Sequence, residues 1–266
     1  MRILALLFWT TQLCLAGSLD LSFQNGGEGS ESYSFAFSNE YNESYSYGFS
    51  QTIDSLKRNR KEKSSAIWLD HISDDYSFSP TLLFVRDNKN RKGLGADILL
   101  RIFHSSKITL SSGLGYIRFK KDIDSEVQSL QFNGDEDYKK FQGQIALAYL
   151  FLPQSEVKVS YKQYSYKDDS DIKVTLNGSF SRALSNISTY GLIQSTKSIS
   201  INHKYRSINV FIGLDHSDFQ NISEKEFYYF SRLSYDLSSK LSLAALIDYE
   251  NLNDSFYYGL SSTLSF

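Results

Sequence analysis

The sequence predicts an all-β fold, a transmembrane antiparallel up-and-down β-barrel of about 16 strands, within a range of roughly 12 to 16. Three observations predict it. Nearly every segment after residue 17 alternates apolar and polar residues, aromatic residues reach 15% in a chain whose mean hydropathy is only −0.34, and the final segment alternates up to Phe266. Many rings in a polar chain indicate rings at an interface rather than in a core.

The first residues have the layout of a secretory signal peptide. Arg2 supplies a positive charge, an apolar run follows over 3–9, and the small residues Ala16 and Gly17 end the segment. We therefore predict that the segment up to Ala16 is removed on export.

This division gives a signal peptide over 1–16 and a single barrel domain over 17–266. Two alternatives remain: the segment could be a buried N-terminal strand or helix, or Cys14 could be lipidated, although Leu13 stands where lipoprotein signals place a small residue. Because Cys14 is the only Cys, the mature chain has no disulfide framework and no thiolate nucleophile.

Charge and hydropathy narrow the class of protein further. The formal net charge is −2, which excludes a generally basic nucleic-acid binder. The longest apolar run of the mature chain, over 145–152, is far shorter than the roughly 20 residues of a membrane-spanning helix. An exported chain without such a helix is either a membrane barrel or a soluble periplasmic or secreted β-protein.

Alternation with a period of two is the main structural signal. Soluble β-sandwiches alternate too, so the composition of the two faces has to decide. The apolar rows are about five residues long and often carry Tyr or Phe near their ends, as in an apolar band about 25 Å tall with aromatic girdles. The opposite rows are rich in Ser, Thr, Lys, Asp and Gly, which suits a wet lumen. The alternating segments include 19–23, 33–37, 45–49, 94–102, 141–151, 208–214 and 241–249.

The connections alternate between short and long, as they do in barrels with short turns on one rim and longer loops on the other. We predict tight turns at 104–107, 152–155, 184–188 and 237–240, and charged loops at 54–63, 121–138 and 218–226. This arrangement places both termini on the short-turn, periplasmic side. The stretch 188–207 is interpreted as two strands.

The final strand carries a second kind of information. Apolar residues alternate in it and Phe stands last, although Ser262 occupies a position that is usually apolar; the matching residues are Tyr258, Leu260, Leu264 and Phe266. This pattern resembles the C-terminal assembly signal of Gram-negative outer-membrane β-barrel proteins, at the level of the porin-like superfamily and of no specific member. The resemblance implies location in the outer membrane, contact with lipid and lipopolysaccharide, and recognition by the barrel-assembly machinery.

A barrel of this size is too wide for its own side chains to fill, so we expect an aqueous channel for passive, weakly selective diffusion of small hydrophilic solutes. Charges of both signs fall on the inward rows, and this mixture selects ions only weakly. Alternatively, these charges only hydrate the lumen and stiffen its wall. The pore-lining candidates are Asp97, Arg101, Lys158, Lys162, Lys173, Lys204, Asp215, Arg232, Asp236 and Asp248.

Two sets of charged loop residues have open interpretations. The acidic 121–138 segment either constricts the pore or is a solvated surface loop. Two basic loops either bind lipopolysaccharide phosphates or another anionic partner, or only solubilise the surface. Their residues are Lys57, Arg58, Arg60, Lys61 and Lys63, and Arg86, Lys89, Arg91 and Lys92. The alternative function is therefore a non-conducting surface barrel for lipopolysaccharide contact, adhesion or envelope structure.

The sequence gives no reason to expect an enzyme. We predict no catalytic, cofactor-binding or metal-binding residues. His216 near the outer rim shares a strand face with Asp218, whereas Asp215 and Ser217 point the other way and are unable to form a triad with it. A homo-oligomer is compatible with this type of barrel.

Overall fold

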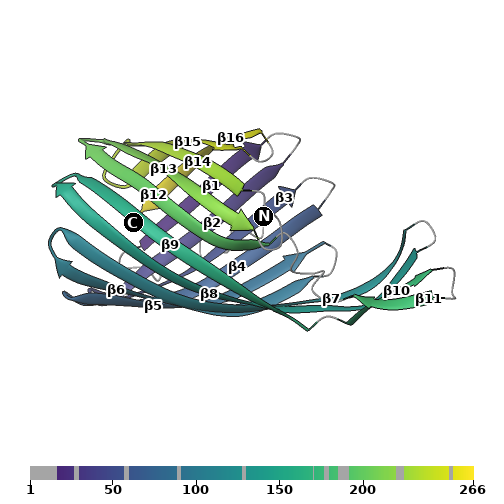
Figure 1. Ribbon diagram of the computed structural model, residues 1–266. Coiled ribbons are helices and arrows are strands. Elements are labelled where there is room, and N and C mark those ends of the chain that lie inside the picture. Colours follow the sequence, from purple (N-terminus) through teal and green to yellow (C-terminus); the bar gives the residue numbers. More distant parts are fainter. Residues whose placement is uncertain are drawn as a thin grey trace.

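The computed structural model describes residues 17–26, 30–56, 60–88, 91–127, 130–169, 171–176, 180–184, 192–219, 225–251 and 254–266. The predicted signal peptide lies outside them. Nearly all described residues are in antiparallel strands that wrap around a central space (Figure 1). No helix in these ranges is long and apolar enough to cross a membrane.

The chain runs through the strands in order. They are β1 (Gly17–Gly26), β2 (Glu31–Asn42), β3 (Tyr45–Leu56), β4 (Arg60–Ile72), β5 (Tyr76–Asp87), β6 (Lys92–Ser105), β7 (Ile108–Val127), β8 (Leu130–Leu152), β9 (Ser155–Asp168), β10 (Asp171–Leu176), β11 (Phe180–Leu184), β12 (Ile193–Tyr205), β13 (Ile208–Phe219), β14 (Lys225–Asp236), β15 (Leu241–Glu250) and β16 (Ser255–Ser265).

Pairing of the first and last strands closes the barrel. β1 pairs with β16 from Ser18 opposite Ser265 to Gly26 opposite Tyr257. At the seam, the backbone groups of Gly17 and Phe266 exchange two hydrogen bonds of 3.0 Å each. On the other side, β9 pairs with both β8 and β12, so the wall needs neither β10 nor β11. The closed barrel therefore has 14 strands, inside the predicted range and two fewer than the predicted number.

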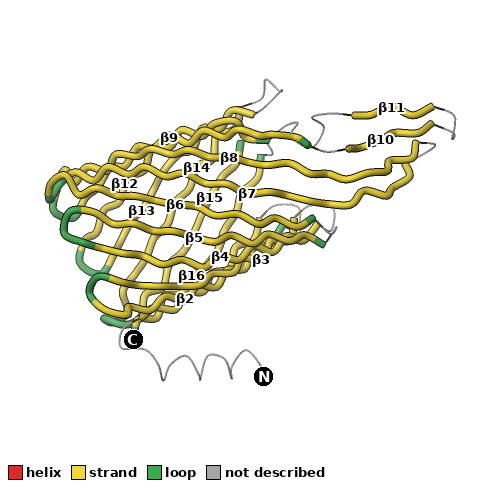
Figure 2. Tube along the Cα trace, turned by 90° about the horizontal axis from the view of Figure 1, so that it is seen from below, coloured by secondary structure: helices red, strands yellow, loops and turns green. Residues whose placement is uncertain are grey.

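The remaining strands form an arm beyond one rim (Figure 2). β7 and β8 continue past the wall as a hairpin, and β10 and β11 add to the free side of β8, with Asp171 opposite Asp135. The prediction of a loop over 121–138, folded into the pore or free, is therefore wrong: β7 pairs with β8 up to Val127 opposite Leu130. Charged residues do not exclude a strand where the hydrogen-bonded pairing of two strands extends beyond the lipid, because neither face then contacts hydrocarbon.

Two other sequence interpretations change for related reasons. Within its described residues, 192–207, the stretch 188–207 forms one strand, β12, and not two; a register irregularity between Ile193 and Ser195 interrupts its alternation. The predicted long loops at 54–63 and 218–226 contain strand at their ends: their described residues, 54–56, 60–63, 218–219 and 225–226, belong to β3, β4, β13 and β14.

The outer face of the wall is apolar and exposed, the reverse of a globular core. Leu114 is 72% exposed, Leu260 68% and Ile145 62%, whereas the buried apolar residues among those described are only Ile117, Tyr138 and Ala244. Lipid is the solvent that makes such a surface stable. The predicted alternation of lipid-facing and lumen-facing residues is therefore present in the wall.

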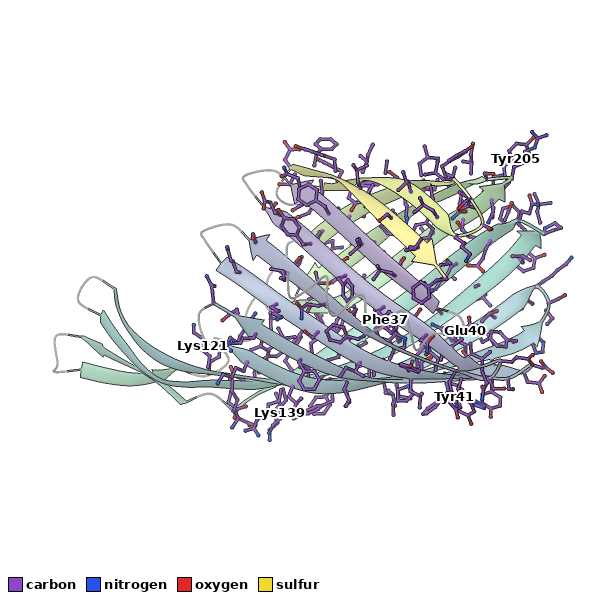
Figure 3. The ribbon with its side chains drawn as sticks, turned by 180° about the vertical axis from the view of Figure 1, so that it is seen from behind. Phe37, Glu40, Tyr41, Lys121, Lys139 and Tyr205 are labelled. Carbon is purple, nitrogen blue, oxygen red and sulfur yellow. The ribbon has the colours of Figure 1, made fainter. Side chains whose placement is uncertain are left out.

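Exposed aromatic residues gather near both ends of this outer face, as in aromatic girdles. Tyr41 and Tyr205 lie near the rim that holds the termini, and Lys139 lies near the opposite rim (Figure 3). The termini-side girdle contains Tyr41, Tyr45, Tyr76, Phe78, Tyr149, Phe151, Tyr205 and Tyr235. The arm-side girdle contains Phe23, Tyr33, Phe84, Tyr116, Phe141, Tyr161, Tyr229, Phe256 and Tyr258.

The positions of the turns also distinguish the two rims. Turns or bends at 43–44, 74–75, 106–107, 153–154, 206–207 and 237–240 all lie on the rim where β1 starts and β16 ends. The predicted tight turns at 104–107, 152–155 and 237–240 fall among them. The one at 184–188 lies mostly outside the described residues.

Candidate functional site

The candidate site is the inner face of the barrel. Two recesses hollow it: one of ≈ 650 Å³ on the wall of β9 and β12–β16, and one of ≈ 310 Å³ on the wall of β4–β8. The larger recess contains Lys158, Lys204, Asp215, Arg232 and Asp236. The smaller one contains Asp97 and Arg101.

The structure places all predicted pore-lining residues except Lys173 on the inner face of the closed wall. Lys173 is opposite Asn133 in the pairing of β10 with β8, so it lies in the arm beyond the rim. Its prediction as a pore-lining residue is wrong because β9 pairs directly with β12 and leaves β10 no place in the ring.

Several inward charges have protein partners in the lumen. Lys204 Nζ lies 3.2 Å from Asp236 Oδ2, and the Ser242 hydroxyl donates to the other Asp236 oxygen at 2.6 Å. Asp248 accepts hydrogen bonds from Gln24 Nε2 at 2.5 Å and from the Tyr228 hydroxyl at 2.7 Å. These contacts fix carboxylates against the wall.

The smaller recess is ordered in a similar way. Gln142 Nε2 donates to Asp97 Oδ1 at 2.9 Å, and Arg101 Nη1 donates to the Ser77 hydroxyl at 3.4 Å. Gly115 makes room for the Asp97 carboxylate, since a Cβ at this glycine would lie 1.7 Å from Asp97 Oδ1. The glycine therefore keeps this acid close to the wall.

Aromatic rings also lie inside the barrel. Phe211 and Phe230 approach within 5.4 Å between ring centroids in the larger recess. A Cβ on Gly213 would lie 2.2 Å from the Phe230 ring, so only glycine lets the ring lie flat on the wall. Such rings offer apolar faces between charged groups.

Three buried polar atoms in the larger recess have no hydrogen-bond partner within the described part of the chain. They are Asn202 Oδ1, Asn209 Oδ1 and Arg232 Nε. Buried polar groups are normally satisfied, and ordered water is the usual partner of such atoms in a polar wall.

Sequence reasoning missed other inward groups. Lys140 Nζ lies 4.3 Å from the centroid of the Tyr164 ring, in a cation–π contact beside the Asp97 recess. Alternation continued back from Phe141 predicts an inward Lys140, but the neighbouring segment had been interpreted as a loop. Asp20, Glu156 and Asp70 also face inward.

Arg91 has a different role from the one predicted. Its Nη2 lies 2.8 Å from Glu62 Oε2, and its Nη1 donates to the Tyr138 hydroxyl at 3.2 Å. Its guanidinium also lies over the Phe119 ring, 5.2 Å from the centroid. Arg91 therefore connects strands at the inner mouth of the barrel and does not belong to an outward basic loop. Of the other basic-loop residues, Lys57, Arg58 and Lys89 lie outside the described residues, as does the side chain of Arg60.

The terminal assembly-signal residues lie on the lipid side. Tyr258, Leu260 and Leu264 are exposed on the outer face of β16, and Phe266 stacks beside Phe37 with ring centroids 6.4 Å apart. Their role in recognition by the assembly machinery stays a prediction.

A closed barrel with an apolar outer surface and a polar, charged inner surface has the architecture of a transmembrane β-barrel, and its fold is that of outer-membrane porins and channels. No protein-family model matches the sequence, and no curated protein matches it either. The particular likenesses are therefore to solved structures.

Three solved structures illustrate the likeness. The CymD monoaromatic hydrocarbon channel shares 9% identity at a TM-score of 0.59, covering 94% of this chain and 87% of that one. The Pseudomonas putida toluene transporter TodX shares 8% identity at a TM-score of 0.56, covering 94% of this chain and 88% of that one. OmpT, an outer membrane protein of Vibrio cholerae, shares 10% identity at a TM-score of 0.53, covering 94% of this chain and 96% of that one. At such identities the likeness concerns the fold alone.

Proposed function

We propose that this barrel is a channel for passive, weakly selective diffusion of small hydrophilic solutes, with both termini in the periplasm. The observation that carries the proposal is the larger recess, whose polar lining includes charges of both signs: Lys158, Lys204 and Arg232 beside Asp215 and Asp236. A mixture of signs attracts solutes of either charge and binds neither tightly.

The dimensions of the wall support the proposal. An 8-stranded barrel is just filled by its own side chains, whereas barrels of about 16 strands hold an aqueous channel, and this barrel lies nearer the second size. Every described strand lies in the wall or in the arm beyond the rim, and none of these described strands crosses the lumen (Figures 1 and 2).

Single-channel recording on the full barrel, refolded and inserted into planar bilayers, tests this function. Heat-modifiable migration in gels identifies the folded protein. We expect stepwise conductance with weak ion selectivity. A folded, heat-modifiable barrel that gives no conductance steps contradicts the channel.

The second candidate is a non-conducting surface barrel, and one observation favours it. Arg91, Phe119 and Tyr138 form a packed cluster on the inner side of the mouth, with Phe119 and Tyr138 stacked at 4.9 Å between centroids. Phe119→Ala tests this observation: if the cluster closes the mouth, a barrel that is silent as the wild type gains conductance steps, whereas conductance steps in the wild type contradict the second candidate.

The proposal assigns no catalytic role to the chain. His216 Nε2 lies 3.9 Å from Asp218 Oδ1, and the Ser217 hydroxyl lies 3.2 Å from Thr196 Oγ1 on the opposite face of the strand. These residues do not form a nucleophile and its base. A hydrolytic activity that disappears in His216→Ala contradicts this assignment.

A further inference from the structure

Four cations form one continuous row on the outer surface. Lys63 is the register partner of Arg86, Arg86 of Lys92, and Lys92 of Lys120. The row thus crosses the adjacent strands β4, β5, β6 and β7 without a break. Neighbouring strands are about 4.8 Å apart, so the row extends over roughly 14 Å. We name these residues the cationic row.

The four side chains face away from the lumen. Each lies on the strand face that carries the exposed apolar residues of its own strand, such as Ile67 on β4 and Leu94 on β6, and each is exposed. The inward neighbour Glu62 pairs with Arg91 and points to the other face. The cationic row therefore belongs to the outer surface.

The charges of this row are poorly compensated by the protein. Lys63, Arg86 and Lys92 have no ion pair within the described ranges, and Lys120 Nζ lies 3.8 Å from Asp137 Oδ2 at the end of the row. Like charges directly opposite each other in a sheet destabilise it. An anion from outside the chain relieves this repulsion.

Two nearby cations on the same outer surface, by contrast, form ion pairs within the protein. Arg118 donates a bidentate pair of hydrogen bonds to Asp137, and Lys139 Nζ lies 2.6 Å from Asp169 Oδ2. The hydrogen bond from Lys139 and its charge hold the pKa of Asp169 below the ordinary value. These cations are satisfied internally, whereas three members of the cationic row are not.

The position of the row identifies the kind of anion. The exposed side chains of Phe84 and Leu94 lie on the same face, two residues along their strands from Arg86 and Lys92. They belong to the arm-side edge of the apolar band. A molecule that contacts both the cationic row and the apolar band must carry phosphate groups next to acyl chains, because Lys and Arg bind phosphate and the band contacts hydrocarbon.

We propose that Lys63, Arg86, Lys92 and Lys120 bind the phosphate groups of lipopolysaccharide in the outer leaflet, through contacts on the wall of the barrel. The site is independent of the channel, and its placement in the outer leaflet follows from the proposed periplasmic termini. The row matches several phosphates spread along the rim better than one compact headgroup.

Native mass spectrometry of the full barrel in detergent tests the site with a defined probe, bis-phosphorylated lipid A. The variant Lys63→Gln/Arg86→Gln/Lys92→Gln/Lys120→Gln removes the row, and Lys107→Gln/Arg206→Gln/Lys240→Gln removes three cations from the termini-side turns as a matched control. We expect binding to fall at least about tenfold in the first variant and to stay unchanged in the second.

Three further measurements separate the sources of phosphate. Dephosphorylated lipid A is expected to bind weakly, and inorganic phosphate and phosphatidylglycerol to compete poorly. Equal binding of phosphatidylglycerol, or unchanged lipid A binding in the quadruple variant, overturns the proposal. If the quadruple variant does not fold, Arg86→Gln alone gives the same comparison, with a loss expected and unchanged binding again contradicting the site.

Discussion

The charges inside the barrel and those of the cationic row lie on opposite faces of one wall, yet they are organised differently. Inside, Lys204 has Asp236, and Asp248 has Gln24 and Tyr228. Outside, like charges stand opposite one another over four strands. The comparison teaches that the lumenal charges Lys204 and Asp248 have partners within the protein, whereas Lys63, Arg86 and Lys92 of the cationic row have no ion pair within the described ranges.

The largest expected effect is a charge placed in the lipid band. Leu114→Arg on the outer face of β7 should destabilise the barrel by about 2–4 kcal/mol, because the charge would meet hydrocarbon. Denaturant unfolding in lipid vesicles measures this loss. Thr52→Arg is the matched change on the inner face, between Ser34 and Ser64 in register, and should cost far less. Equal losses in both variants contradict the assignment of the two faces.

The next effect concerns assembly. Phe266→Ala should strongly reduce the amount of barrel that reaches the outer membrane, because it removes the ring that lies beside Phe37 and the last residue of the predicted assembly signal. Fractionation with a heat-modifiability assay measures the folded amount. Ser265→Ala, one residue earlier and on the inner face, is the control, and normal accumulation of the Phe266 variant sinks the prediction.

A smaller effect is expected in the lumen. Lys158→Gln/Arg232→Gln should shift ion selectivity toward cations, with a change of roughly twofold in permeability ratio because other charges of both signs remain. Reversal potentials across a salt gradient measure the shift. Lys63→Gln/Lys92→Gln on the outer face should leave the ratio unaltered, and a comparable shift there would erase the distinction between the two faces.

The smallest effect depends on pH. The hydrogen bonds and charge of Arg118 hold the pKa of Asp137 below its ordinary 3.8. A lowered carboxyl pKa stabilises the folded state above the unfolded pKa, and this contribution is lost as pH falls through the folded value. Thermal unfolding of Asp137→Asn should therefore lose part of its sensitivity to acid below about pH 4. An unchanged acid profile argues against the pair.

Local alternation explains how much of this structure the sequence could predict. It placed Lys158 and Lys204 inside and Leu260 outside, because the face of a residue follows from its parity in a strand. It failed for Lys173, because the choice of β9 or β11 as the neighbour of β12 depends on pairing across the sheet, and the choice of β9 leaves β10 outside the ring. It failed for Arg91 as well, because the rings of Phe119 and Tyr138 draw the guanidinium inward at a loop that looked simply basic.

The seam between Gly17 and Phe266 constrains how the barrel is made. β1 waits for its second neighbour until β16 has been synthesised, so closure joins the two described strands that are farthest apart in the sequence. Contacts of this kind form slowly, and until then β1 presents an open edge. Covering this edge until β16 arrives would protect β1 from pairing with the wrong strand.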